Sequence, residues 1–196
     1  MTAMDRLTDY TLYADAQRHY SKEALWALFD GDRERLNIGH ECVDRHDRDE
    51  VAVRIAHESG RDETISFGAL SDASNRLANY LLNKGLAKGD RVAIMLEPSL
   101  PFYVALFGAM KAGCVAVPLF PLFGPDGLRL RIDDCTPKLL VTNADLAHLA
   151  ENIETVIADD AFLAALDAES ADFTPETASS DMAMYQYTSG TTRELP

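Results

Sequence analysis

The stretch RVAIMLEPSLPFYVALFGAMKAGCVAVP, residues 91–118, decides the fold class of this chain. Residues 91–96 form a nearly continuous apolar run, which is expected of a strand buried on both faces. Residues 114–117 form a second run of the same kind. Two buried strands separated by a helix-length segment predict a parallel strand–helix–strand crossover.

The segment between these two strands carries the punctuation of a helix. Pro98 and Pro101 bracket its start, and Gly113 follows its expected end. We therefore predict a helix over 102–111, and Pro118 closes the strand that follows it.

The rest of the chain repeats the same α/β signals more weakly. Short alternating or continuous apolar runs indicate strands, and apolar residues at helical spacing indicate helices. We therefore expect an α/β fold, a parallel-sheet subdomain with flanking helices. The further expected elements are a helix over 20–31 capped by Ser21, strands at 51–55 and 64–67, a helix that stops at Gly85, a helix over 128–134, a strand over 138–142, a helix from Asn143 to about 157, a short helix near 162–166 and a strand over 182–187.

The composition is that of a soluble globular protein of 196 residues, with 47% hydrophobic and 26% charged residues. Its three cysteines, Cys42, Cys114 and Cys135, are odd in number and widely spaced, which argues against a disulfide framework. The first residues lack the apolar core of a secretory signal, and no run approaches the ~18 apolar residues of a membrane span. The expected location is the cytoplasm.

The net charge of −14 makes a nucleic-acid partner a poor hypothesis, because phosphate backbones select basic surfaces. Nine of the acidic residues lie in 151–181, which contains no Lys or Arg. We interpret this stretch as a solvated face or linker, and not as a site for an anionic nucleotide.

The most informative motif is YTSGTT, residues 187–192, directly after the strand expected at 182–187. A turn with one glycine and four hydroxyl side chains can direct several N–H and O–H donors at one anion, such as a nucleotide phosphate. From composition alone, a surface loop is the favoured interpretation, because Ser, Thr and Gly are common loop residues.

Other candidate sites are weaker. His40, Cys42 and His46 supply only three ligands in one short segment, without the paired spacing of structural zinc, so we expect packing and capping roles and no metal. Cys42 has no evident general-base partner that would make it a nucleophile. The G-x-x-x-x-G-K-[ST] and G-x-G-x-x-G nucleotide motifs are absent from the sequence. No catalytic residue is assigned.

Several segments together resemble the adenylate-forming AMP-dependent synthetase and ligase family, closest to the acetyl-CoA and medium-chain acyl-CoA synthetases. They appear in the family's order and cover most of the chain from about residue 37. The segments are NIGHECVDRH (37–46), TISFGALSDASNRLANYLLNKGLAKGDRVAIML (64–96), FGAMKAGCVAVPLFPLFGPDGLRLRIDDC (107–135), PKLLVT (137–142) and YQYTSGTT (185–192).

The resemblance implies a ligase of fatty acid metabolism that acts in two steps. A carboxylic acid attacks the α-phosphate of Mg-ATP to give an acyl-adenylate, and coenzyme A then displaces AMP. In the family the loop wraps the ATP phosphates. The residues that the resemblance assigns to these phosphates are Thr188, Ser189, Gly190, Thr191 and Thr192.

The end of the motif departs from the family, which continues Gly-x-Pro-Lys-Gly after TSGTT. Here Arg193 stands where glycine is expected, followed by Glu194, Leu195 and Pro196. One hypothesis is that Arg193 supplies the positive charge that the family's lysine brings. The two are not equivalent, because the planar guanidinium of arginine and the compact ammonium of lysine bind phosphate with different geometries. The family's adenine pocket, magnesium-binding glutamate, hinge and C-terminal lysine all lie downstream of this loop.

These departures lead to four expectations. Residues 1–50 form an N-terminal helical segment, and 51–196 are the truncated N-terminal part of the large adenylate-forming domain. The chain alone does not form an acyl-adenylate. Exposed sheet edges lead it to self-associate. The alternatives are a non-catalytic binding or assembly module that reuses the fold, and an adenylation domain that loads a carrier-protein thiol in place of coenzyme A.

Overall fold

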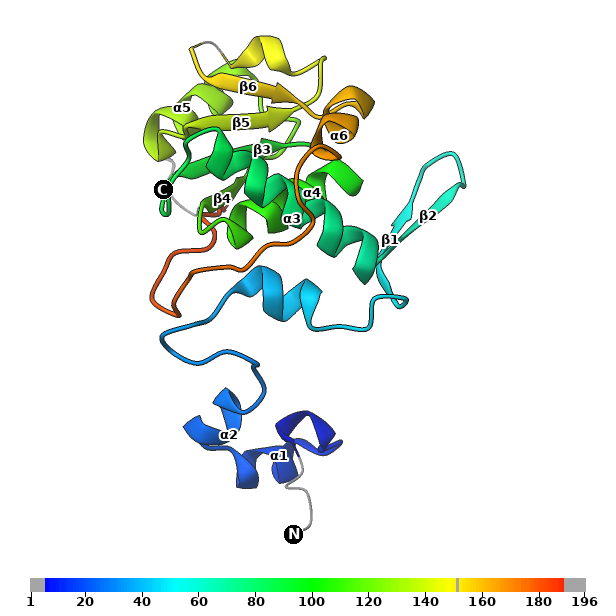
Figure 1. The fold of residues 1–196 in the computed structure, drawn as a ribbon, viewed down its shortest axis with the longest axis vertical. Helices are drawn as coiled ribbons and strands as arrows, with labels where there is room; N and C mark the ends of the chain where they lie inside the picture. Colours follow the sequence, from blue (N-terminus) through cyan, green and yellow to red (C-terminus); the bar gives the residue numbers. More distant parts are fainter. Residues whose placement is uncertain (1–5, 151, 189–196) are drawn as a thin grey trace.

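A computed structural model describes residues 6–150 and 152–188. Its centre is a four-stranded sheet in the order β4-β3-β5-β6, in which all neighbouring strands are parallel (Figure 1). The strands are β3 (Arg91–Met95), β4 (Val115–Pro118), β5 (Leu139–Thr142) and β6 (Glu154–Ile157). The predicted α/β fold and the parallel pairing of the strands at 91–96 and 114–117 are confirmed.

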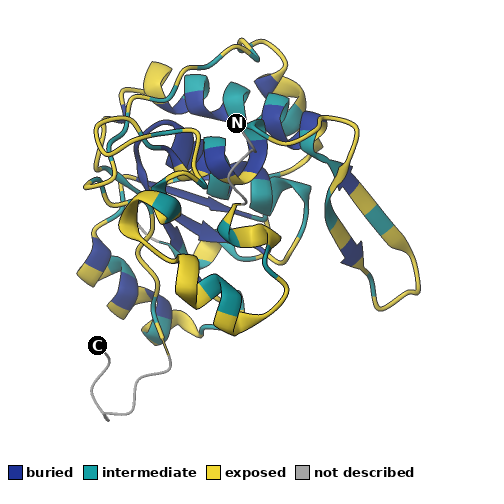
Figure 2. Cartoon of the chain, turned by 90° about the horizontal axis from the view of Figure 1, so that it is seen from below, coloured by how far each residue is buried: buried dark blue, intermediate teal, exposed yellow. Residues whose placement is uncertain are grey.

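The sheet is covered on both faces. Successive residues of a strand point to opposite faces, and in β3 Val92 and Ile94 join one hydrophobic cluster while Ala93 and Met95 join another. The first cluster holds α3 (Phe67–Asn83), α4 (Leu100–Lys111) and α6 (Asp160–Leu166); the second holds α5 (Pro125–Cys135) and the 3-10 turn η3 (Ala147–Leu149). Figure 2 shows the strands buried and the outward faces of the helices exposed.

The helices begin within one turn of the predicted starts, and α4 begins at Leu100 where 102 was predicted. Ser99 caps α4 through its hydroxyl, which accepts from the Phe102 amide, and Pro101 occupies the first turn. Ser66 caps α3 in the same way, so Phe67 starts that helix and does not end the preceding strand. The helix predicted at 128–134 begins one turn earlier, at Pro125.

The strands predicted at 51–55 and 64–67 form a separate antiparallel hairpin, β1 (Val51–Ala56) with β2 (Asp62–Ser66), and do not join the central sheet. The hairpin projects beyond the end of α3 (Figure 1). Among its residues only Ile55 and Ile65 are buried.

The N-terminal segment is less regular than predicted. It contains η1 (Leu7–Asp9), α1 (Tyr13–His19), α2 (Lys22–Trp26) and a π-helical turn, η2 (His40–Asp44). Ser21 caps α2 as predicted, but the predicted extension of this helix to residue 31 is wrong.

Side chains of the η2 region explain the early end of α2. The Arg45 guanidinium donates to the Leu28 carbonyl at 2.9 Å, and the Glu41 carboxylate accepts from the amides of Asp30 and Gly31. These long-range hydrogen bonds give partners to backbone amides and carbonyls after Trp26, so these groups do not need the hydrogen bonds of a continued helix.

The helix predicted from Asn143 to about 157 is also wrong. Asn143 accepts a hydrogen bond from the Leu146 amide at 2.9 Å, but it caps only a short turn that leads to η3. Asn152 then adopts a positive φ of 66°, which breaks any helix. The β-branched run Thr155-Val156-Ile157 pairs along β5 as β6.

The acidic stretch is partly structured, because it contains β6 and α6. Beyond α6 the chain runs along α3, where Asn75 donates to the Ala171 carbonyl and Asn79 donates to the Ser170 carbonyl, both at 2.8 Å. Most of its described acidic side chains are exposed. No helix in the described ranges is long and apolar enough to cross a membrane.

Candidate functional site at the carboxyl edge of the sheet

The run at 182–187 meets the sheet beside β4. It makes a single parallel bridge, between Ala116 and Met184. The strand predicted over 182–187 is therefore wrong in extent, because only this one bridge forms within the described residues. The Ala116 amide donates to the Ala183 carbonyl at 3.0 Å, and the Tyr185 amide donates to the Ala116 carbonyl at 2.9 Å. Because the bridge is parallel, the chain leaves toward the carboxyl ends of the strands.

An open, mainly apolar hollow of about 340 Å³ lies at this edge. In doubly wound α/β folds, ligands bind outside the carboxyl ends of the strands. Glu97 and Gln186 are the polar side chains of the wall. The lining residues are Leu96, Glu97, Pro98, Phe102, Pro118, Leu119, Phe120, Pro121, Phe123, Gln186 and Tyr187.

Tyr187, the last lining residue, is held by the final turn of α5. Its hydroxyl donates to Asp134 Oδ2 at 2.6 Å and lies 3.1 Å from the Arg131 carbonyl. Tyr185 donates to the same Asp134 oxygen at 3.1 Å. Burial, together with the bond to Asp134, raises the pKa of the Tyr187 phenol above its ordinary value.

Arg131 places a positive charge next to Tyr187. It is 7% exposed, and its guanidinium carbon lies 3.7 Å from the ring centre of Phe123 and 5.4 Å from that of Tyr187. Such stacking on aromatic faces stabilises a desolvated cation. One guanidinium nitrogen donates to the Gly127 carbonyl at 2.7 Å, while Nε has no hydrogen-bond partner within the described part of the chain.

Of the residues that the sequence assigns to ATP phosphates, only Thr188 is described, and it is exposed directly after Tyr187. Ser189, Gly190, Thr191, Thr192 and Arg193 lie outside the described residues, so their roles stay predictions. Arg131 and Asp134 are site residues that the sequence alone does not indicate. The sequence offers only a weak signal for them, the charged run Arg-Ile-Asp-Asp at 131–134 shortly before a strand.

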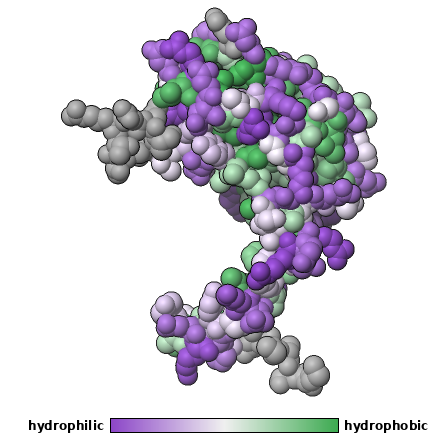
Figure 3. Space-filling model, turned by 90° about the vertical axis from the view of Figure 1, so that its left-hand side faces the viewer, coloured by the Kyte–Doolittle hydropathy of each residue, from purple (hydrophilic) through white to green (hydrophobic). Residues whose placement is uncertain are grey.

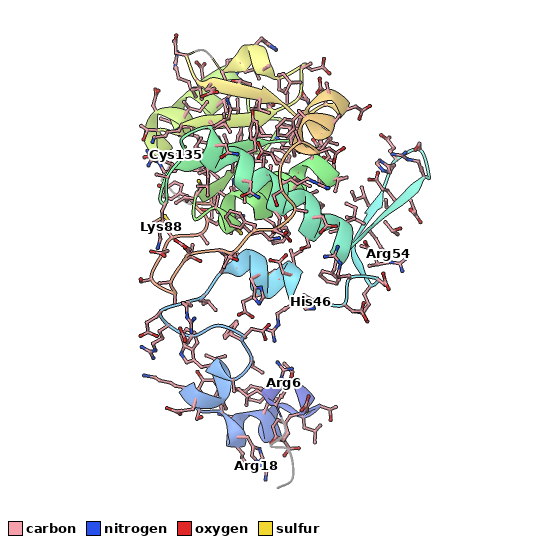
Figure 4. All side chains as sticks on the ribbon, viewed as in Figure 1. Arg6, Arg18, His46, Arg54, Lys88 and Cys135 are labelled. Atoms are coloured by element: carbon pink, nitrogen blue, oxygen red, sulfur yellow. The ribbon has the colours of Figure 1, made fainter. Side chains whose placement is uncertain are left out.

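The three residues first considered as metal ligands have separate partners. His40 Nε2 lies 3.2 Å from Asp30 Oδ2, Cys42 is exposed, and the His46 ring stacks on Phe67 with centres 4.5 Å apart. Figure 4 shows His46 beside η2, far from Cys135 at the end of α5. Within 6–150 and 152–188, no group of three or more His, Cys, Asp or Glu is placed to hold a metal.

The Cys42 thiol is not activated. Partial desolvation and the neighbouring Glu41 carboxylate raise its pKa, which lowers the thiolate fraction at neutral pH. A nucleophilic role for Cys42 is therefore not supported by its surroundings.

The fold and the site together define a doubly wound α/β domain whose carboxyl edge carries a hollow and Thr188, the first residue after Tyr187 in the hydroxyl-rich motif of the sequence. The family model described as "AMP-binding enzyme" matches residues 40–193. The chain belongs to this family. The expected division of the chain at residue 50 stays a prediction.

Curated and solved relatives agree with this assignment. Acetyl-coenzyme A synthetase of Rhodobacter capsulatus is 34% identical over 149 residues, which are 74% of this chain and 22% of that protein. The crystal structure of Brucella canis acyl-CoA synthetase matches with a TM-score of 0.81 and 30% identity, over 91% of this chain and 36% of that one. ATP-bound MatB from Rhodopseudomonas palustris matches with a TM-score of 0.65 and 28% identity, over 80% of this chain and 33% of that one.

These figures also fix how much of a relative the chain represents. It spans about a fifth of the length of the Rhodobacter protein and about a third of the two solved chains. The matched part corresponds to the N-terminal part of the enzymes of the adenylate-forming family.

Proposed function

We propose that this chain is the N-terminal, phosphate-binding part of an AMP-forming acyl-CoA synthetase. In the proposed reaction a carboxylic acid attacks the α-phosphate of ATP, forming an acyl-adenylate and releasing pyrophosphate. The coenzyme A thiol then attacks the acyl carbon, forming the thioester and releasing AMP. The chain's own role is to hold the β- and γ-phosphates.

The first step brings an anionic carboxylate to a polyanion, so the phosphates must be neutralised and held in line with the attacking oxygen. In the proposal, the hydroxyls of Thr188, Ser189, Thr191 and Thr192 donate to phosphate oxygens. Gly190 lets the backbone approach closely because it has no Cβ. Arg193 adds positive charge at the end of the turn.

Mg²⁺ is proposed to arrive with ATP. Within the described residues, no three His, Cys, Asp or Glu side chains come together as metal ligands. When bound to ATP, the ion neutralises part of the phosphate charge. The residues at 188–193 are proposed to act on the phosphate oxygens that it leaves free.

One observation carries the proposal. The parallel bridge between Ala116 and Met184 directs the chain to the carboxyl edge, so that Thr188 follows Tyr187 at the rim of the hollow. A surface loop elsewhere on the sheet would not have this placement. The ATP bound in the MatB neighbour supports ATP as the nucleotide.

The test is exchange of labelled pyrophosphate into ATP, measured with and without a panel of short and medium-chain carboxylic acids. The chain extended to the length of its relatives should catalyse exchange that depends on the acid, and the 196-residue chain alone should not. Coenzyme A and a carrier-protein thiol, supplied in parallel as acceptors, identify the second step. If the extended protein shows no pyrophosphate exchange that depends on a carboxylic acid, the proposal is rejected in favour of a non-catalytic module.

A further inference from the structure

The chain that enters the proposed phosphate turn is fixed from two sides. On one side, the Tyr185 amide and the Ala183 carbonyl bond to the backbone of Ala116 in β4. On the other side, the hydroxyls of Tyr185 and Tyr187 meet at one oxygen of Asp134 in α5. We call Tyr185, Tyr187 and Asp134 the tyrosine–aspartate cluster.

Within this cluster Tyr187 is the more strongly held residue. Its hydroxyl lies 2.6 Å from Asp134 Oδ2, whereas that of Tyr185 lies 3.1 Å away. Bonds to a charged acceptor are the short and strong class. The two rings also meet edge to face, with centres 5.1 Å apart.

The ring of Tyr187 is fixed as well as its hydroxyl. It packs in the hydrophobic cluster that covers the α5 face of the sheet, and it neighbours the buried guanidinium of Arg131. Arg131 is itself held by Phe123 and by the Gly127 carbonyl. Tyr187 therefore has little freedom, although it is the residue directly before Thr188.

We infer that Asp134 is a positioning residue for the turn that begins at Thr188, acting through the hydroxyl of Tyr187. This inference rests on the proposed function. A ligand-binding turn must start from a fixed point if its donors are to converge on one anion. The bridge at Met184 fixes the backbone three residues before Tyr187, and the bond between Tyr187 and Asp134 fixes the residue directly before Thr188.

The first test measures local order in the 196-residue chain. Tyr187→Phe removes one hydroxyl and keeps the ring, and Asp134→Asn removes the carboxylate charge. Asp133→Asn is the matched control, because Asp133 is an exposed neighbour on α5 with the same charge. We expect the backbone ¹⁵N order parameter of Thr188 to fall in the first two variants and not in the control, with the melting temperatures of all three within about 4 °C of one another, the shift that one lost hydrogen bond causes.

The second test measures affinity for magnesium pyrophosphate by calorimetric titration. Losing one charge-assisted bond that orders the turn should weaken binding about tenfold in Tyr187→Phe and Asp134→Asn, and leave Asp133→Asn unchanged. A purely structural role would lower the melting temperature without this loss of affinity.

The outcomes separate the two claims. If Thr188 order and pyrophosphate affinity in Tyr187→Phe and Asp134→Asn equal those of Asp133→Asn, Asp134 does not position the turn. If Thr188 loses order as expected but the unmodified chain binds no pyrophosphate, the positioning of the segment stands and the phosphate role of the turn fails.

Discussion

Lys111, the last residue of α4, is fully buried, and its ammonium group forms an ion pair with Asp44 at the end of η2. Ser74 Oγ and Asn75 Oδ1 of α3 accept from the same ammonium group, each at 2.8 Å. The ammonium group therefore connects α4 with η2 and α3. Lys111 does not line the hollow at the carboxyl edge. Burial lowers the pKa of Lys111, while Asp44 opposes this shift.

Removing one partner of this pair should be strongly destabilising. Asp44→Ala leaves a buried ammonium group without its counter-charge, which costs about 3–5 kcal/mol for a broken buried pair. Removing both charges in Asp44→Ala with Lys111→Met should recover part of this loss. Urea unfolding measures both, and an Asp44→Ala variant within 0.5 kcal/mol (about the scatter for surface substitutions) of the unmodified chain would contradict the assignment.

The contact between α3 and α4 depends on a glycine. A Cβ added to Gly108 would lie 2.8 Å from a Leu77 side-chain carbon, closer than such atoms pack. Gly108→Ala should therefore cost about 1–3 kcal/mol through overpacking. Gly127→Ala in α5 is the control, since its nearest neighbour lies 3.5 Å away and helical Gly→Ala gains about 0.5–1 kcal/mol. Equal melting temperatures for the two variants would refute this packing.

The stability of the folded chain should depend on pH through the phenol of Tyr187. Its pKa is raised in the folded state, so its contribution to stability is complete below the unfolded value of about 10 and is lost as pH rises above that value. The unmodified chain should thus lose more stability than Tyr187→Phe between about pH 9 and pH 11. Parallel unfolding curves across this range for the two proteins would show that the phenol is not held as described.

Self-association remains a prediction for this chain. β6 is an edge strand of the described sheet, and near the opposite edge Leu122, Met182 and Phe120 are 77%, 60% and 56% exposed. Figure 3 shows hydrophobic residues in patches between hydrophilic ones on the main body. Exposed edges and apolar patches favour association. Light scattering should give a mass above the monomer's 21.6 kDa, and a sharp monomer would count against this expectation.

The sequence was sufficient for those parts of the fold that depend on local signals. Residues 91–118 combine two apolar runs with prolines and a glycine at the helix ends, and each signal agrees with the next. A helix was wrongly predicted over 143–157 because the apolar spacing of this segment also suits a helix. The strand β6 forms there because its residues pair with the free edge of β5.

The site was harder to predict for a similar reason. The motif at 187–192 was visible in the sequence, but its anchor was not. Asp134 and Tyr187 are 53 residues apart, and their meeting depends on the placement of α5 against the sheet. No local pattern marks such a pair.

The most direct test of the central claim is to map where magnesium pyrophosphate binds on the ¹⁵N-labelled chain. We expect amide shifts to concentrate at 188–192 and to extend to Leu96 and Leu119 at the rim of the hollow. Shifts confined to other surfaces, or none at saturating ligand, would contradict a phosphate-binding turn at the carboxyl edge of this sheet.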